Sequence, residues 1–224
     1  MAKTENINVL IIDNQPLFTF GLSILLEKAN KFNIIGTAVN CAGALKIAKE
    51  KKPGLVLMEM RLGSENVLDL IPKLKVINPE VSILIISIQD ERYYAERVLR
   101  LGARGFVLKT EPAEVIMNAI YTILDNKVYL SDNERERILQ SMTEESSPGV
   151  KDWITSLQFL SNRELEIFSF MAKGLGTIEI ASRLNLSKKT VEVHKEHLKI
   201  KLQCNTIQEL KQKAIEWSNR SGNI

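Results

Sequence analysis

The chain has 224 residues, of which 45% are hydrophobic and 25% are charged, and its net charge is +3. This length fits two domains of ordinary size, and the apolar fraction is normal for packed cores. No apolar run approaches the ~18 residues that a membrane span needs, and the first residues carry no hydrophobic export signal. The two isolated cysteines, Cys41 and Cys204, indicate neither a disulfide framework nor a zinc site. We therefore expect a cytoplasmic protein that does not associate with membranes.

Residues 1–126 alternate between strand-like and helix-like patterns. Five short runs have the length and continuous apolarity of strands buried on both faces: Ile7–Ile12, Phe32–Ala38, Leu55–Met58, Ile83–Ile86 and Gly105–Leu108. Elsewhere apolar residues recur every three or four positions, which predicts helices at about Pro16–Ala29, Ala42–Lys51, Glu65–Ile77, Glu91–Leu101 and Pro112–Asn126. This alternation predicts an α/β doubly wound fold, with a five-stranded parallel sheet and right-handed crossover helices on both faces.

Residues 127–158 are predicted to be a linker to a second domain at 159–224. From Asp132 to Gly149 the chain is polar and loses clear apolar periodicity, although a helix could begin at Asn133–Met142. The second domain is predicted to be all-α, with helices at about Asn162–Lys173, Thr177–Leu184, Lys188–Leu202 and Thr206–Trp217. Local signals that support these bounds are a capping box at Ser161 and Glu164, and turn and cap residues at Asn185 and Ser187.

The basic excess of the chain lies in its last third. Residues 150–224 carry 12 Lys and Arg against 8 Asp and Glu, a net charge of +4. Five of these lysines fall within fourteen residues: Lys188, Lys189, Lys195, Lys199 and Lys201. Such a cluster suits a phosphate-contacting surface, because each lysine that neutralises a phosphate releases a counterion. By itself the signal is weak, since a lysine-rich helix face is more often simply solvated.

Polar side chains follow the predicted strands at the sheet edge where ligands bind in doubly wound folds. They are Asp13 and Asn14 after the first strand, Glu59 after the third, Ser87 after the fourth and Lys109 after the fifth. Two carboxylates, a hydroxyl and an ammonium that converge at one edge would make an anion or Mg²⁺ pocket. The alternative is structural, because polar residues normally end buried strands.

Four stretches make the sequence recognisable. Residues 7–126 resemble the receiver domain of bacterial two-component response regulators, through Val9–Phe18, Pro53–Glu59 and Gly102–Lys109. Residues 155–220 resemble the LuxR-type helix-turn-helix domain, through Leu160–Leu202. The pairing is similar to the NarL/FixJ class of regulators. The resemblance implies a flavodoxin-like receiver fold, a small DNA-binding domain, and a transcription factor rather than an enzyme.

Two positions depart from the active receivers that this domain resembles. Such receivers place an acidic pair after strand one, a phosphorylated aspartate after strand three, a Ser or Thr after strand four, and a lysine after strand five. Asp13, Ser87 and Lys109 match this pattern. Asn14, however, replaces the second acid of the pair, and Glu59 stands at the acceptor position.

These departures change the expected chemistry of the pocket. Asn14 removes one anionic ligand of Mg²⁺, a metal ion that already gives up its water reluctantly. Glu59 is one methylene longer than aspartate, and a displacement of ~1 Å from the geometry of in-line attack can cost ~100-fold in rate. We therefore hypothesise a receiver that is not switched by phosphorylation and holds no metal or cofactor. A histidine kinase could act on it but is not required.

The role of Glu59 stays open at this point. It can mimic phosphoaspartate by reaching toward Lys109 and Ser87, which would hold an active-like state. It can instead form a simple ion pair with Lys109, which would leave the domain as a dimerisation scaffold. Phe106 resembles the aromatic that rotates in switching receivers, and otherwise it is a packed core residue. Two rival functions are a phosphorelay receiver that still binds Mg²⁺ and accepts a phosphoryl group, and a receiver that binds a partner or small molecule to control DNA binding.

The helix predicted from Lys188 has the features of a major-groove reader. Its apolar positions, Val191, Leu198 and Leu202, would pack on the preceding helices while a charged stripe faces outward. The resemblance makes this helix the contact with double-stranded promoter DNA. We expect phosphate contacts from Lys188, Lys189, Thr190 and His194, base-edge contacts from Glu192, Val193, Lys195 and Glu196, and either kind from Lys199. For Glu196, an ion pair with Lys199 within the helix is an equal alternative.

Two further features bear on assembly and chemistry. The last helix has an apolar face larger than a three-helix core demands, formed by Ile207, Leu210, Ala214, Ile215 and Trp217. Proteins that this chain resembles dimerise through that helix, so we expect a homodimer on a pseudo-palindrome. The alternative is that Trp217 closes the core of its own domain. His194 and His197 share one helix, but no further ligand supports a metal site, and no catalytic constellation is present.

Overall fold

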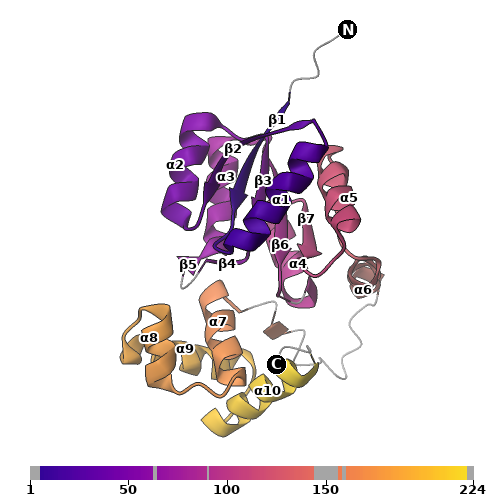
Figure 1. Cartoon of the computed structure of the whole chain (residues 1–224). Coiled ribbons are helices and arrows are strands. Elements are labelled where there is room, and N and C mark those ends of the chain that lie inside the picture. The colour runs from indigo at the N-terminus through magenta and orange to yellow at the C-terminus, as the bar shows by residue number, and fades with distance from the viewer. Residues whose placement is uncertain (1–5, 63–64, 90, 144–155, 158–159, 221–224) are drawn as a thin grey trace. The chain divides into compact units, whose positions relative to one another are not determined.

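The computed structural model describes residues 6–62, 65–89, 91–143, 156–157 and 160–220. The chain divides into two compact units, Met1–Thr143 and Glu144–Ile224, whose elements are drawn in Figure 1. Among the described residues, no helix combines the length and apolarity that crossing a bilayer would take.

The first unit is built on a five-stranded sheet of parallel strands in the order β2-β1-β3-β6-β7. The strands are β1 (Ile7–Ile12), β2 (Phe32–Ala38), β3 (Leu55–Met58), β6 (Ser82–Ser87) and β7 (Gly105–Leu108). The strand order reverses between β1 and β3, so the carboxyl ends of these two strands flank the crevice where ligands bind in such folds. The doubly wound α/β fold predicted from the sequence is confirmed.

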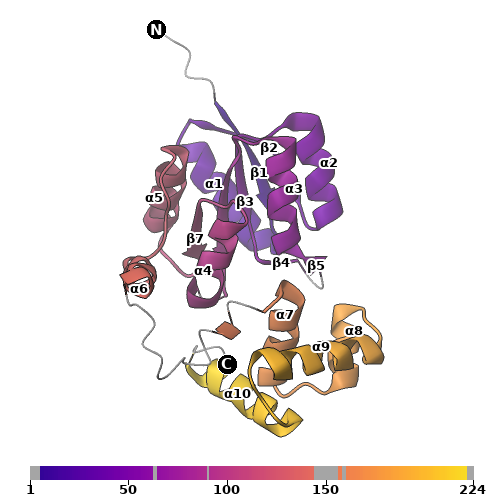
Figure 2. The same ribbon diagram turned by 180° about the vertical axis from the view of Figure 1, so that it is seen from behind.

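Helices cover both faces of this sheet (Figures 1 and 2). One face carries α1 (Pro16–Lys28) and α5 (Ala113–Leu124), and the other carries α2 (Cys41–Lys51), α3 (Leu70–Ile77) and α4 (Glu91–Arg100). On the first face Leu26 of α1 and Ile120 of α5 pack with strand residues such as Ile11 in a fully buried core. Because helices cover both faces, the central strands β3 and β6 are buried along their whole length, which explains their continuous apolar runs, whereas the edge strand β2 is only partly buried.

The helix predicted at Glu65–Ile77 is shorter than expected. Its first residues instead form β5 (Glu65–Asn66), which pairs antiparallel with β4 (Arg61–Leu62), and a 3-10 turn follows at Val67–Asp69. The Glu65 carboxylate also accepts a hydrogen bond of 2.5 Å from the backbone N–H of Cys41, at the start of α2. Strand pairing and this long-range cap outweigh local helix propensity, so α3 begins only at Leu70.

The first unit continues past residue 126, where the sequence analysis placed its end. After α5, the N–H of Tyr129 donates to the Arg104 carbonyl at 3.0 Å, and the Tyr129 carbonyl accepts from the Phe106 N–H at 3.1 Å. Tyr129 therefore lies alongside β7, and α6 (Asp132–Thr143) follows and contacts α4. Residues 127–143, which we expected within the linker, are part of this folded unit. The remaining linker residues, except 156 and 157, lie outside the described part of the chain.

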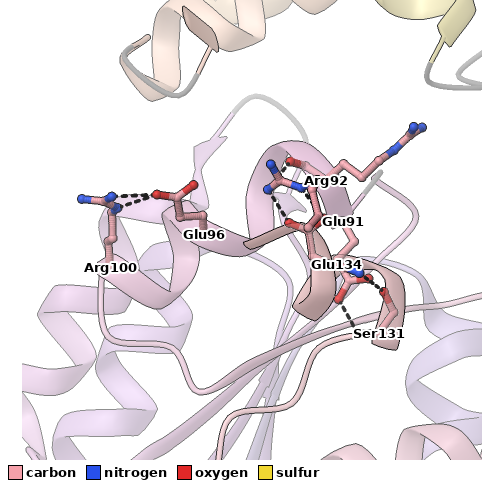
Figure 3. A network of polar contacts seen from close by, with 7 residues as sticks. Glu91, Arg92, Glu96, Arg100, Ser131 and Glu134 are labelled. Carbon is pink, nitrogen blue, oxygen red and sulfur yellow. Dashed lines mark hydrogen bonds and ion pairs between the residues drawn. The ribbon is translucent and has the colours of Figure 1, made fainter. Parts of the chain in front are cut away.

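A polar network joins α6 to α4, which explains why no apolar pattern marked this helix (Figure 3). Glu91, buried at the start of α4, accepts a hydrogen bond of 2.9 Å from the Ser131 N–H. The Ser131 hydroxyl in turn accepts from the Glu134 N–H at 3.2 Å. The buried carboxylate of Glu134 pairs with Arg137 at 2.6 Å, and Arg137 also donates to the Arg92 carbonyl at 3.5 Å. Charge-assisted hydrogen bonds thus hold a helix of polar composition against the receiver fold.

The described residues of the second unit form four α-helices: α7 (Asn162–Ala172), α8 (Thr177–Leu184), α9 (Lys188–Lys201) and α10 (Ile207–Arg220). Each lies within a few residues of its predicted bounds. The capping box is present, because Ser161 Oγ accepts from the Glu164 N–H and the Glu164 carboxylate accepts from the Ser161 N–H. Asn185 is left-handed with a φ of 53°, and Ser187 caps α9 by accepting from the Thr190 N–H at 3.0 Å.

α9 lies at the centre of this unit, in contact with α7, α8 and α10. Val191, Leu198 and Leu202 are buried, as predicted. Trp217 of α10 is also buried, and its ring centroid lies 5.4 Å from that of Phe168 in α7. The alternative that Trp217 closes the core of its own domain is therefore confirmed, and Trp217 adds nothing to an outward apolar face.

Candidate functional site

The register of the parallel strands brings the polar strand-end residues together. β1 and β3 are paired up to their last residues, so Asp13 and Glu59 follow on adjacent strands. β6 and β7 are paired in the same way, which places Lys109 next to Ser87. All four side chains are buried: those of Asp13, Glu59 and Lys109 are at most 4% exposed, and Ser87 is inaccessible. The predicted convergence of these residues at one sheet edge is confirmed.

One ammonium joins the two carboxylates of this pocket. Lys109 Nζ lies 2.5 Å from Oδ2 of Asp13 and 2.7 Å from Oε2 of Glu59. It also lies 4.4 Å from the ring centroid of Phe18, in the first turn of α1, so an aromatic face adds a favourable cation–π contact. Sequence reasoning missed Phe18, because nothing in its local context distinguishes it from an ordinary core aromatic.

The remaining carboxylate oxygens also have donors within the chain. Oδ1 of Asp13 accepts a hydrogen bond of 2.8 Å from the Gln15 N–H. Oε1 of Glu59 accepts from the hydroxyl of Ser87 and, at 2.6 Å, from the N–H of Met60. Each of the four oxygens is therefore matched by an ammonium, hydroxyl or amide donor, as buried carboxylates require.

Two of the predicted pocket residues contribute differently. Asn14 is exposed and makes none of the contacts just described. Phe106 is fully buried in β7, as a packed core aromatic would be. The pocket is therefore formed by Asp13, Glu59, Ser87 and Lys109, with Phe18 against the ammonium.

This arrangement does not fit a Mg²⁺ ion held by the strand-end acids. Mg²⁺ demands near-octahedral oxygen ligands at short distances, and receivers that bind it offer a pair of acids after the first strand. Here the second member of that pair is the neutral, exposed Asn14, and the Lys109 ammonium already lies between the two remaining carboxylates. A divalent cation would have to displace hydrogen bonds and an ion pair that are already satisfied.

The predicted DNA-contacting helix, α9, has an exposed face of mixed charge. Of its predicted contact residues, Thr190, His194 and Lys199 are half-buried, and those fully on the surface are Lys188, Lys189, Glu192, Val193 and Glu196. Both glutamates pair within the helix, Glu192 with Lys188 at 3.7 Å and Glu196 with Lys199 at 2.9 Å. The alternative of an intrahelical ion pair for Glu196 is thus confirmed.

Lys195 corrects the predicted outward stripe. Its side chain was expected to point toward base edges, but the residue is only 6% exposed, and its ammonium donates a hydrogen bond of 2.8 Å to Thr177 Oγ1 at the start of α8. Burial lowers the pKa of Lys195, and the positive charge of Lys211 on α10 lowers it further. A helical wheel places Lys195 at the edge of the charged stripe, and the neighbouring helices then cover that edge.

The two histidines of α9 meet an acidic residue of α7, which sequence reasoning also missed. One candidate ligand atom from each of Glu164, His194 and His197 lies within 4.8 Å of the other two. Burial would raise the pKa of Glu164, but hydrogen bonds from Lys201 and Ser161 hold it below its usual range. Burial also lowers the pKa of His194. The sequence pattern around the histidine pair contains no third ligand, because Glu164 lies on a different helix, α7.

Comparison with known proteins agrees with the fold of both units. Residues 9–121 match the response regulator receiver domain, and residues 158–214 match the luxR family of bacterial regulatory proteins. The chain therefore belongs to the response regulators of the LuxR family, which combine a receiver with a helix-turn-helix domain.

Individual relatives resemble the chain over almost its whole length. It is 32% identical over 209 residues to the oxygen regulatory protein NreC of Staphylococcus aureus, which covers 93% of this chain and 96% of that protein. A structure of RcsB from Salmonella typhimurium has a TM-score of 0.66 at 22% identity, and covers 95% of this chain and 98% of that one. RcsB from Salmonella enterica serovar Typhimurium bound to promoter rprA in the presence of phosphomimetic BeF3- has a TM-score of 0.63 at 24% identity, with coverages of 93% and 98%.

Proposed function

We propose that this chain is a cytoplasmic transcriptional regulator that binds promoter DNA as a homodimer, and that its receiver acts without aspartate phosphorylation. One observation carries the second part of the proposal: the carboxylate of Glu59 contacts both the Lys109 ammonium and the Ser87 hydroxyl. In the receivers that this domain resembles, the corresponding lysine and hydroxyl meet the phosphoryl group. Glu59 thus supplies a permanent negative charge to the same two partners, which favours phosphoaspartate mimicry over a simple ion pair with Lys109 alone.

The same contacts oppose phosphoryl transfer to Glu59. Phosphoryl transfer relies on positioning and on a metal ion that neutralises the developing charge. The Glu59 oxygens are held by Lys109, Ser87 and the Met60 N–H, and the pocket does not fit Mg²⁺. Attack on a phosphodonor would need these contacts to break and an ion to bind where the chain supplies only one acid of the usual pair. A histidine kinase is therefore not required for the active-like state.

DNA binding by α9 is supported by the family and by the exposed residues of the helix. RcsB, a structural relative, is described bound to promoter rprA and as two dimers bound to two parallel DNAs. In this chain Lys188 and Lys189 are exposed in the first turn of α9, where they can reach phosphates. Glu192 and Val193 follow on the exposed surface and are the proposed base-edge contacts.

The decisive experiment combines phosphorylation and DNA binding on one preparation. The purified chain is incubated with acetyl phosphate and Mg²⁺, its intact mass is measured, and binding to duplexes selected from a random pool is measured before and after. We expect no added phosphoryl group, and an affinity that is already high and does not change. A stoichiometric gain of one phosphoryl group would contradict the proposal.

A matched pair of variants separates the receiver from the DNA-binding domain. Glu59→Gln removes the negative charge that Glu59 supplies to the pocket and is expected to weaken DNA binding, whereas Glu80→Gln, at an exposed position of the same unit, is expected to leave it unchanged. If Glu59→Gln binds DNA as tightly as the unaltered chain, mimicry by Glu59 is wrong. A chain that ignores duplex DNA even at low salt would overturn the DNA-binding proposal itself.

A further inference from the structure

Three side chains with metal-binding groups meet where α9 packs on the start of α7. His194 and His197 are three residues apart on α9, so they lie on the same side of the helix. Glu164 is the third residue of α7, and one ligand atom from each of the three residues lies within 4.8 Å of the others. Small rotations of side chains bring atoms at such distances to the separations found around a tetrahedral ion.

The carboxylate of Glu164 is already oriented for such a role. Its side chain is 4% exposed, and Oε2 accepts hydrogen bonds from the Ser161 N–H at 2.6 Å and from Lys201 Nζ at 2.7 Å. Oε1 lies 3.8 Å from Nδ1 of His197, on the side of the histidine pair. Hydrogen bonds to one oxygen that fix a carboxylate are the usual outer support of a metal ligand.

The two imidazoles differ in a way that suits metal binding. The Nδ1 atom of His194 is buried and makes no hydrogen bond to any residue of the described structure, which leaves a polar group without a partner. His197 is 54% exposed, so its ring is able to turn toward Glu164 without disturbing the core. The Glu164 carboxylate is thus buried and held by hydrogen bonds, Nδ1 of His194 is buried without a partner, and the His197 side chain is largely exposed.

We propose that Glu164, His194 and His197 bind one divalent transition-metal ion, best matched by Zn²⁺, with water as the fourth ligand. Two imidazole nitrogens and one carboxylate oxygen are ligands that Zn²⁺ takes at 2.0–2.2 Å in tetrahedral geometry, whereas Mg²⁺ and Ca²⁺ prefer all-oxygen sites. The ion would join α9 to the start of α7. The argument for this site does not rest on the DNA-binding or receiver functions proposed above, although His194 and His197 belong to the same helix α9.

Two consequences follow from its position. A metal that binds only the folded chain stabilises the second unit by mass action, so its unfolding temperature rises with metal concentration. The Lys201 ammonium stays on Oε2 and repels the ion, so the affinity is below that of a thiolate-rich structural site. Stabilisation of the second unit is measurable on the full chain, because Trp217 is buried in that unit and the sequence of the first unit contains no tryptophan.

The test is calorimetric titration of the tag-free full chain with Zn²⁺, with thermal unfolding followed by tryptophan fluorescence. We expect one ion per chain and a rise in unfolding temperature of roughly 5 °C or more at saturation. Co²⁺ in place of Zn²⁺ should give the visible absorption of a tetrahedral nitrogen and oxygen site. His194→Gln and His197→Gln should each weaken binding by at least about tenfold. Glu196→Gln, a carboxylate on the same helix outside the cluster, should leave metal binding unchanged.

His197 is largely exposed, so His197→Gln should keep the fold even if His194→Gln does not. Both variants also retain the two free cysteines, Cys41 and Cys204. Loss of binding in His197→Gln supports the site. The proposed site is wrong if the unaltered chain does not bind Zn²⁺. It is also wrong if His197→Gln binds Zn²⁺ as tightly as the unaltered chain, because the ion is then held by other ligands.

Discussion

The ammonium of Lys109 lies 2.7 Å from the carboxylate of Glu59, and each side chain is less than 5% exposed. The longer side chain of glutamate is therefore accommodated inside the pocket rather than turned out to solvent. Asp13 lies on the other side of the same ammonium at 2.5 Å, so two carboxylates share one cation. The Ser87 hydroxyl and the Met60 N–H donate to the Glu59 carboxylate and compensate its charge further.

Lys109→Met should strongly destabilise the first unit. It leaves Asp13 and Glu59 buried next to each other without a cation, and breaking a buried pair in this way costs about 3–5 kcal/mol. The measurement is urea unfolding followed by circular dichroism, with tryptophan fluorescence as a separate report on the second unit. Adding Glu59→Gln to Lys109→Met should recover part of the loss, because one unpaired charge is then gone. If the double variant is no more stable than Lys109→Met alone, the buried charge of Glu59 does not need the Lys109 ammonium to compensate it.

Restoring the usual receiver residues should restore phosphorylation. Asn14→Asp together with Glu59→Asp supplies the missing acid and an acceptor of normal length, so the variant should take up one phosphoryl group from acetyl phosphate in the presence of Mg²⁺. Intact mass before and after chelation of the metal measures this directly. Asn14→Asp alone, with Glu59 retained, is the control and should remain unmodified. Phosphorylation of that single variant would show that the length of Glu59 is not the obstacle.

Most of the fold could be predicted from the sequence because it follows from periodicity. Continuous apolar runs identified the five strands of the sheet, and three- and four-residue spacing identified the helices. Prediction was wrong at Glu65, because the pairing of β5 with β4 and a hydrogen bond to Cys41, twenty-four residues away, outweigh local helix propensity. It also gave no contacts for α6, because that helix is joined to α4 by polar contacts, from Ser131 to Glu91 and from Arg137 to the Arg92 carbonyl, rather than by an apolar stripe.

The residues of the candidate sites also divide into those that the sequence predicts and those that only the structure brings together. Asp13, Glu59, Ser87 and Lys109 were predictable because parallel strands end at a common edge, and their chain positions alone bring them together. The meeting of Glu164 with His197 was not predictable, since it depends on how two helices cross. Local pattern therefore determines which element a residue belongs to, while contacts between elements must be read from the structure.

Lys189→Ala should weaken binding to all DNA sequences alike. Lys189 is exposed in the first turn of α9, where a phosphate contact positions the protein without reading bases. Losing one such contact should reduce the slope of log affinity against log salt by about 1. The measurement is fluorescence anisotropy with a selected and a random duplex at several salt concentrations. Lys195→Met, which removes a buried lysine from the same helix, should leave the salt slope unchanged. A sequence-dependent loss for Lys189→Ala would contradict a phosphate contact.

Lys195 should also give the second unit a characteristic dependence on pH. In the folded state the pKa of Lys195 lies below its value of about 10.4 in the unfolded chain. Burial of the ammonium is the larger cause, and the positive charge of Lys211 is the smaller one. The unfolded chain therefore binds more protons in the window between the two pKa values, and stability rises with pH across that window. At neutral pH the ammonium is charged in both states, and its burial costs stability that is recovered only when it deprotonates.

Lys195→Met should consequently raise the stability of the second unit at pH 7, by about 1 kcal/mol, because an apolar side chain of similar length replaces a buried charge. The gain should shrink as the pH rises toward the pKa of an unfolded-chain lysine, because the lowered pKa of the folded-state ammonium lets it lose its proton before that point. Urea unfolding followed by tryptophan fluorescence at several pH values measures both effects. Lys189→Met, at an exposed position of the same helix, should show no such pH-dependent difference. If Lys195→Met is less stable than the unaltered chain at pH 7, the hydrogen bond from Lys195 to Thr177 outweighs the cost of burying the charge.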